Sequence, residues 1–158
     1  MKLLNIVFRS IGLMFATMLV VIGYVVAPML FSSLDQVTAG NLVSQLLSYA
    51  NSALLISLFG LLIIVIGRID RFVHNWLLII SVLIVLSTEY WISPLMKTIK
   101  AAYPSGLTKA SPDWSTFAMW HGIYQLLFLI LILALFIWSL INLKHMILNN
   151  KKYDKKSL

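Results

Sequence analysis

The sequence predicts an all-α membrane protein, an antiparallel bundle of four transmembrane helices with both termini in the cytoplasm. Of its 158 residues, 61% are hydrophobic and only 11% are charged, whereas soluble domains are nearer half apolar and one quarter charged. The hydrophobic residues form long runs, and about 20 apolar residues suffice to cross the hydrocarbon of a bilayer. The third observation is the uneven distribution of lysine and arginine, which indicates the orientation.

The first span is expected at residues 11–31, a charge-free apolar run that follows Lys2 and Arg9. A basic start before an apolar run also describes a signal peptide, but this run is longer than a signal-peptide core and lacks a cleavage site, so we expect an uncleaved helix. Pro28 removes a backbone hydrogen bond and predicts a kink near the end of the span. One face carries small residues that favour close packing against another helix: Gly12, Ala16, Gly23 and Ala27.

The second span is expected at residues 42–66. Gln45 and Ser48 fall on one side of this helix at 100° per residue, with Asn51 beside them. A stripe of small residues that includes Gly60 runs next to this polar side. Polar and small residues are typical of helix interfaces in lipid, so this helix is expected inside the bundle.

The third and fourth spans are expected at residues 76–94 and 117–143. Glu89 lies inside the third span, where a charge costs roughly 2.5–3.5 kcal/mol on insertion scales. This carboxyl group is therefore expected near the headgroups, protonated, or paired within the bundle. Pro94 predicts a second kink or a helix end.

The four spans make one transmembrane domain over residues 1–143, joined by a polar connection at 32–41, a basic turn near 67–75 and a longer loop at 97–115. The tail at 144–158 holds five lysines and is expected to be disordered beyond its first turn. No internal repeat is evident along the chain.

The positive-inside rule places both termini in the cytoplasm of an inner-membrane protein. The side of the termini has nine basic residues: Lys2, Arg9, Arg68, Arg71, Lys144, Lys151, Lys152, Lys155 and Lys156. The other side has three, which are Lys97, Lys100 and Lys109. The net charge of +7 is thus explained by topology and anionic lipid headgroups, and no nucleic-acid partner is expected.

With this topology, the unusual polar residues of several helices meet at one level. Glu89 lies roughly 7–8 Å below Pro94, and His121 lies roughly 9 Å from the start of the fourth span, at 1.5 Å per residue. Both are then in the outer half of the membrane, where they form a natural pair. The expected outward-facing polar pocket consists of Glu89, His121, Gln45, Ser48, Tyr124 and Gln125.

Two interpretations of this pocket stay open. Ionisable groups inside a membrane often mark ion or substrate pathways, so the pair can serve as a proton relay, a metal site or a polar substrate site. Alternatively, Glu89 and His121 form a buried hydrogen bond that fixes helix packing, with Gln45 and Tyr124 as further partners.

Cofactor and catalytic signals are weak. Glu89 and His121 provide only two metal ligands, whereas a catalytic zinc site needs about three. His74 and His145 lie at the inner ends of two helices and offer a remote possibility of bis-histidine haem. The chain has no cysteine and no Ser-His-Asp arrangement, so we predict no cofactor, no catalytic residue and a non-enzymatic protein.

Several short motifs resemble the transmembrane-protein-205-like family of unknown function. They are Gly23-x4-Pro28-x2-Phe31 followed by Ala39-Gly40, then Ile92-Ser-Pro94-x-Met96, and Phe117-x3-His121-Gly122. The resemblance covers about residues 13–143. It implies a four-helix integral membrane protein, in bacteria of the inner membrane, that is distantly similar to copper-resistance membrane proteins, and it implies no particular reaction. The chain lacks the His- and Met-rich clusters of a dedicated copper carrier.

The leading hypothesis is a membrane protein whose Glu89/His121 pocket handles a proton, a cation or a small polar ligand. The alternative is a structural or accessory subunit that uses its small-residue faces to form a homo-oligomer or a larger membrane complex. A haem-containing electron carrier or membrane enzyme is a third hypothesis.

Overall fold

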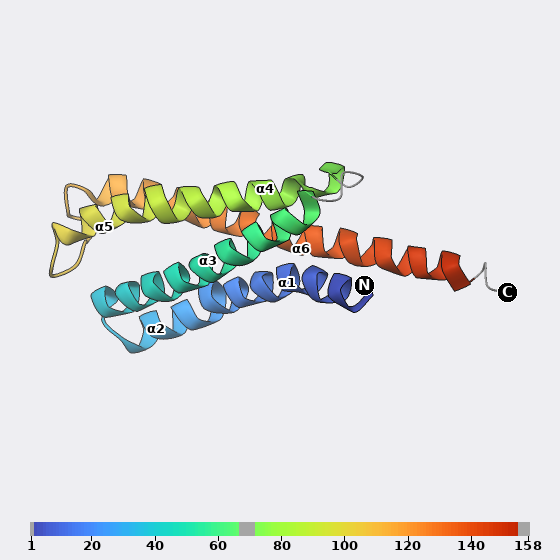
Figure 1. Ribbon diagram of the computed structural model, residues 1–158. Coiled ribbons are helices and arrows are strands. Elements are labelled where there is room, and N and C mark those ends of the chain that lie inside the picture. The colour runs from blue at the N-terminus through green and yellow to red at the C-terminus, as the bar shows by residue number, and fades with distance from the viewer. Residues whose placement is uncertain (1, 67–71, 155–158) are drawn as a thin grey trace.

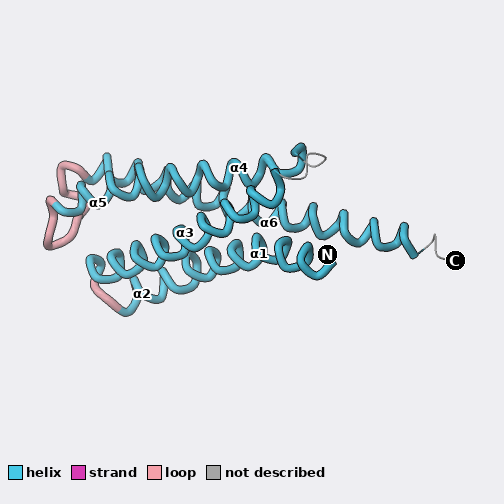
Figure 2. Tube along the Cα trace, viewed as in Figure 1, coloured by secondary structure: helices cyan, strands magenta, loops and turns pink. Residues whose placement is uncertain are grey.

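The computed structural model of the chain describes residues 2–66 and 72–154, with side chains described for 10–63 and 75–141. All regular structure in these ranges is helical (Figure 1 and Figure 2). The elements are α1 (Lys2–Val20), the π-helical segment η1 (Val21–Val26), α2 (Ala27–Ser33), α3 (Gln36–Ile66), α4 (Phe72–Ser87), the π-helical segment η3 (Thr88–Ile92), α5 (Ser93–Ala101) and α6 (Trp114–Asp154).

Four stretches are long and apolar enough to cross a membrane. They are Ser10–Ser33, Gln36–Ile63, Asn75–Ala101 and Trp114–Ile141. Each includes most of one predicted span, so the prediction of a multi-pass helical membrane protein is confirmed at the level of length and composition.

The helices extend further than the sequence predicted. The polar connection expected at 32–41 shrinks because α3 begins at Gln36, where the Asp35 carboxylate accepts hydrogen bonds from the backbone N–H groups of Val37 and Thr38, both at 3.0 Å. Such a side-chain acceptor satisfies N–H groups that the first turn leaves unpaired. The third membrane helix does not end at Pro94, and α6 continues to Asp154, well into the tail that was expected to be disordered.

Both predicted kinks coincide with π-helical segments. The Ala27 N–H bonds to the carbonyl of Ile22, and the Ser93 N–H to that of Thr88, so each bond spans five residues instead of four. Each segment ends two residues before a proline, which then occupies the first turn of α2 or α5, where no N–H is required.

This shared pattern is an internal similarity that the linear sequence did not make evident. Ile22-Gly-Tyr and Thr88-Glu-Tyr open matching stretches, each with its tyrosine four residues before the proline. Gly23 and Glu89 therefore occupy corresponding positions in the first and third membrane helices.

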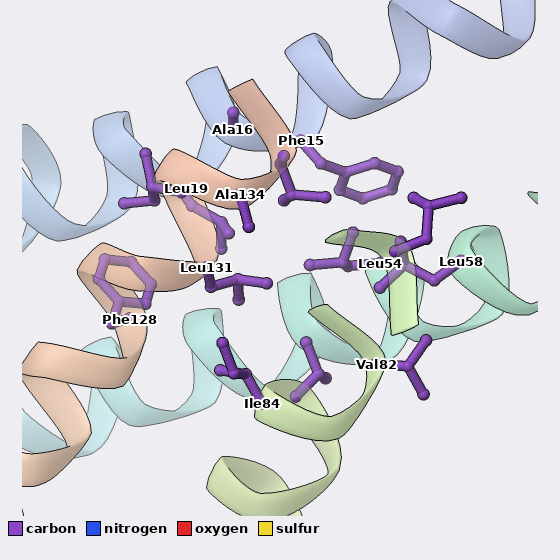
Figure 3. Packing of buried hydrophobic residues seen from close by; sticks show 14 of the residues in the cluster. Phe15, Ala16, Leu19, Leu54, Leu58, Val82, Ile84, Phe128, Leu131 and Ala134 are labelled. Carbon is purple, nitrogen blue, oxygen red and sulfur yellow. The ribbon is translucent and has the colours of Figure 1, made fainter. Parts of the chain in front are cut away.

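Buried side chains from all four membrane helices, many of them leucines, form the core. Leu19 of α1, Leu54 of α3, Leu78 of α4 and Leu135 of α6 are almost completely buried. Figure 3 shows α1 and α6 meeting through Ala16, Leu19, Leu131 and Ala134. α6 packs on both α1 and α4, and α3 packs on α4, so α6 is the central helix.

Small residues of the first membrane helix provide this close approach to α6. A Cβ atom at Gly12 would lie 2.5 Å from the Ser139 Oγ, and one at Gly23 would lie 2.7 Å from the Phe128 ring. Ala16 and Ala27 are buried. Gly60, by contrast, is exposed, and no atom lies within 4 Å of a Cβ built there. Gly60 therefore does not mediate close packing against another described helix of this chain.

The helices separate toward one end of the molecule. In Figure 1, α2 and the start of α3 run together, as do α5 and the start of α6, and the two pairs diverge toward the α2–α3 and α5–α6 connections. We call this the loop end. The two termini lie toward the opposite end.

Candidate polar site at Glu89

Glu89 lies where the two diverging helix pairs are still joined. It belongs to η3, and its half-buried carboxyl group receives two hydrogen bonds from α3. Ser48 Oγ donates to Oε1, and Asn51 Nδ2 donates to Oε2 at 3.2 Å. These two hydrogen bonds connect the pairs at the base of the opening.

Asn51 and Tyr124 extend this polar cluster into the core. Asn51 is 2% exposed and Tyr124 is 8% exposed. The Tyr124 side chain interacts with Asn51 and lies within electrostatic range of Glu89. The Asn51 Oδ1 is buried and has no hydrogen bond of good geometry from any side chain that the structure describes. Asn51 was absent from the predicted pocket, although its position three residues after Ser48 places it on the same side of α3.

His121 has a different environment from the one predicted. Its Nε2 lies 3.0 Å from the Gln125 Nε2, and its ring stacks on Phe117 with the ring centroids 5.7 Å apart. The hydrogen bonds of Glu89 lead instead to α3. The prediction of a direct Glu89–His121 pair is therefore wrong, because the described hydrogen bonds of the two residues do not join them.

A small cavity nevertheless brings four of the predicted residues together. It has a volume of about 110 Å³, and Ser48, Glu89, His121 and Tyr124 all line it. Gln45 lines a neighbouring larger cavity instead. Gln125 lines neither of these two cavities and is connected to them by its hydrogen bond to His121.

The larger cavity opens at the loop end between the diverging helix pairs. Its volume is about 760 Å³, and it shares Lys97, Lys100 and His121 with the smaller cavity. Tyr103 of the α5–α6 loop also lines it. The Tyr103 hydroxyl donates a 2.8 Å hydrogen bond to Asp113, and this bond raises the pKa of Tyr103.

The two lysines are functional candidates that the sequence did not reveal. They were expected in the loop at 97–115, but α5 continues to Ala101 and both lysines line the cavities. The Lys100 Nζ lies 5.5 Å from the centre of the Phe117 ring, which is a cation–π distance. This placement follows from the continuation of the helix past Pro94, which the sequence did not predict.

Metal and haem sites receive no structural support. No group of three or more His, Cys, Asp or Glu side chains that could hold a metal ion occurs in the described part of the chain. The side chains of His74 and His145, considered for haem, lie outside the described residues.

The comparison with known families identifies an uncharacterised family. A family model described as a domain of unknown function, DUF4149, matches residues 10–105. This match supports an uncharacterised family but does not support the specific transmembrane-protein-205-like assignment. No curated protein and no solved structure matches the chain.

Proposed function

The chain belongs to the DUF4149 family, whose function is unknown, and we propose that it is an inner-membrane protein whose polar pocket at Glu89 takes up a proton, a cation or a small polar ligand from the outer side. One observation carries this proposal. The carboxyl group of Glu89 lies in an apolar span, is held by Ser48 and Asn51, and lines a cavity.

The energetic cost of placing Glu89 inside the membrane and the geometry of its surroundings support a functional interpretation of this residue. An ionisable group inside a membrane is costly and usually faces a bundle interior or an aqueous path. A purely structural hydrogen bond between helices requires only neutral groups, as the Trp138 Nε1 to Asn75 Oδ1 bond of 3.3 Å illustrates near the other end of the bundle. Glu89 instead exposes part of its side chain to a cavity that continues toward the loop end.

We further propose that the bundle is antiparallel with both termini in the cytoplasm, so that the loop end faces outward. The excess of nine basic residues over three on the terminal side supports this orientation. In that orientation the cavities at the loop end open to the outer face of the membrane.

The accessory-subunit hypothesis has less support. Gly12, Ala16, Gly23 and Ala27 pack within the chain and are not free to join another protein. The exposed face around Gly60 is the remaining small-residue surface, and lipid is its simplest occupant.

A carbodiimide-labelling experiment tests the pocket. Dicyclohexylcarbodiimide is a hydrophobic reagent that modifies carboxyl groups in apolar surroundings, so we expect it to enter the cavity and modify Glu89. Mass spectrometry of the protein in membrane vesicles locates the adduct. Glu89→Gln should remove it while leaving insertion intact, because the amide keeps a hydrogen-bond acceptor for Ser48.

Asp113 in the exposed loop is the internal control, and a water-soluble carbodiimide should modify it in the same sample. If Asp113 reacts and Glu89 stays unmodified, the cavity does not admit a ligand and Glu89 is a packing residue.

A further inference from the structure

We propose that the larger cavity at the loop end binds the phosphate headgroup of an anionic phospholipid between Lys97 and Lys100. Both lysines also line the smaller cavity with Glu89, but the proposal concerns the larger cavity and does not require ligand uptake at Glu89. Five properties of the cavity support it: its charge, the position of Lys100, its size, its apolar walls and its level within the membrane.

Two lysines give the cavity a positive charge. Lys97 and Lys100 line it, and its lining includes no Asp or Glu. An anion bound in the cavity would be attracted by both ammonium groups, because opposite charges at short range favour the charged form of each group.

Lys100 is directed into the cavity and away from open water. Lysine side chains near the ends of membrane helices normally extend toward the interface. The half-buried Lys100 instead places Nζ over the Phe117 ring and 3.6 Å from where a Cβ of Gly40 would lie. The ammonium group of Lys100 therefore lies beside α3, between the helix pairs.

The size and walls of the cavity fit the headgroup of an amphiphile better than a free ion. A volume of about 760 Å³ is in the range of about 300–1,000 Å³ typical of ligand pockets. Phe31 and Trp114 provide apolar walls. The outer surface beside the cavity is also apolar, with Leu42 of α3 and Met119 of α6 exposed, so acyl chains can remain in lipid while the headgroup enters.

The level of the site within the membrane is also that of lipid phosphates. Lys97 and Lys100 lie in the last turns of the third membrane span, and Trp114 begins the fourth. Tryptophan and tyrosine are enriched at this depth, where headgroups meet water. A phosphate group would therefore reach the lysines without leaving its own layer.

Native mass spectrometry of the full chain in detergent tests the proposal by titration with phosphatidylglycerol, phosphatidylcholine and inorganic phosphate. We expect saturable retention of one phosphatidylglycerol. Its affinity should fall about thirtyfold in the double variant Lys97→Gln/Lys100→Gln, because each lysine near an anionic lipid contributes about fivefold. Lys97→Arg/Lys100→Arg should retain the lipid.

The basic tail also attracts anionic lipid, so Lys151→Gln/Lys152→Gln is the matched control. It removes the same charge elsewhere and should keep the saturable lipid. Gly40→Leu provides a second test that leaves the charge unchanged, since its side chain would enter the cavity next to Lys100 and exclude the headgroup. This variant keeps the proposal testable if the double lysine variant fails to fold.

Three results would overturn the proposal. Equal retention of phosphatidylcholine and phosphatidylglycerol would show that the lysines select no anionic headgroup. Equal loss of affinity in the tail control and the cavity variant would indicate attraction by net charge alone. Displacement of the lipid by inorganic phosphate at equal concentration would make free phosphate the ligand. A carbodiimide result at Glu89 alters none of these outcomes.

Discussion

At the scale of single residues, the structure separates polar from steric roles. Glu89 joins α3 to η3 through Ser48 and Asn51, and Lys100 of α5 lies over Phe117 of α6. Gly12 has a purely steric role, because the absence of a side chain lets α1 approach Trp138 and Ser139 of α6. Each residue type is required by its immediate neighbours.

Gly12→Ala should destabilise the protein by about 1–3 kcal/mol, the usual cost of overpacking a filled core. The new Cβ would lie 2.5 Å from the Ser139 Oγ and 3.0 Å from the Trp138 ring, so α1 and α6 must move apart. Unfolding in a denaturing detergent mixture measures the loss.

Gly122→Ala is the matched control on α6, since nothing lies within 4 Å of its Cβ position. Alanine there should stabilise the helix by up to about 1 kcal/mol. Equal stability of the Gly12 and Gly122 variants would contradict close packing of α1 on α6.

At the scale of elements, helix ends and π-helical segments decide where side chains point. Asp35 begins α3 directly after α2, which leaves a very short connection. Pro28 and Pro94 follow π-helical segments and continue their helices instead of ending them. A π-helical segment changes the rotation of all later residues relative to a regular α-helix, and such segments are frequent at functional sites.

Asp35→Ala should loosen the first turn of α3, whereas Asp35→Asn, which keeps an acceptor oxygen, should preserve it. The hydrogen bonds from Thr38 and Val37 lower the pKa of Asp35 below its ordinary value. The stabilisation is therefore present above the ordinary carboxyl pKa and disappears as the pH falls through the lowered pKa of the folded state.

Hydrogen exchange of the Val37 and Thr38 amides, expressed as protection relative to the unfolded chain, measures this effect. Protection in the wild type should decrease at acidic pH, and protection in Asp35→Ala should be low throughout. Undiminished protection in the alanine variant would mean that Asp35 does not stabilise the start of the helix.

At the scale of the whole molecule, the helices pack closely where α6 meets α1 and α4, and they separate at the loop end. The closed part contains the leucine core (Figure 3), and the open part contains both cavities. The proposed orientation places this opening on the outer side of the membrane.

Single-cysteine labelling tests the orientation, because the chain contains no cysteine. Ser105→Cys in the α5–α6 loop should react with a membrane-impermeant maleimide in intact cells. Asn149→Cys near the C-terminus should react only after permeabilisation. The reverse pattern would invert the topology and direct the cavities toward the cytoplasm.

Much of this architecture follows from the sequence alone. Hydropathy is a local property, so the four spans, the anomaly of Glu89 and the small-residue face of Gly12 and Gly23 are visible in the linear chain. The basic residues also indicate an orientation without any knowledge of packing, although that orientation remains a prediction.

Only the tertiary structure decided which polar groups meet. The sequence interpretation paired Glu89 with His121 because the two lie at a similar depth, but Glu89 lies in η3 and bonds to Ser48 and Asn51 instead. Continuation of the helix past Pro94 likewise brought Lys100 into a cavity. Hydrophobicity determines that a helix crosses the membrane, whereas the direction of each side chain depends on the turns that precede it and on the helices that pack around it.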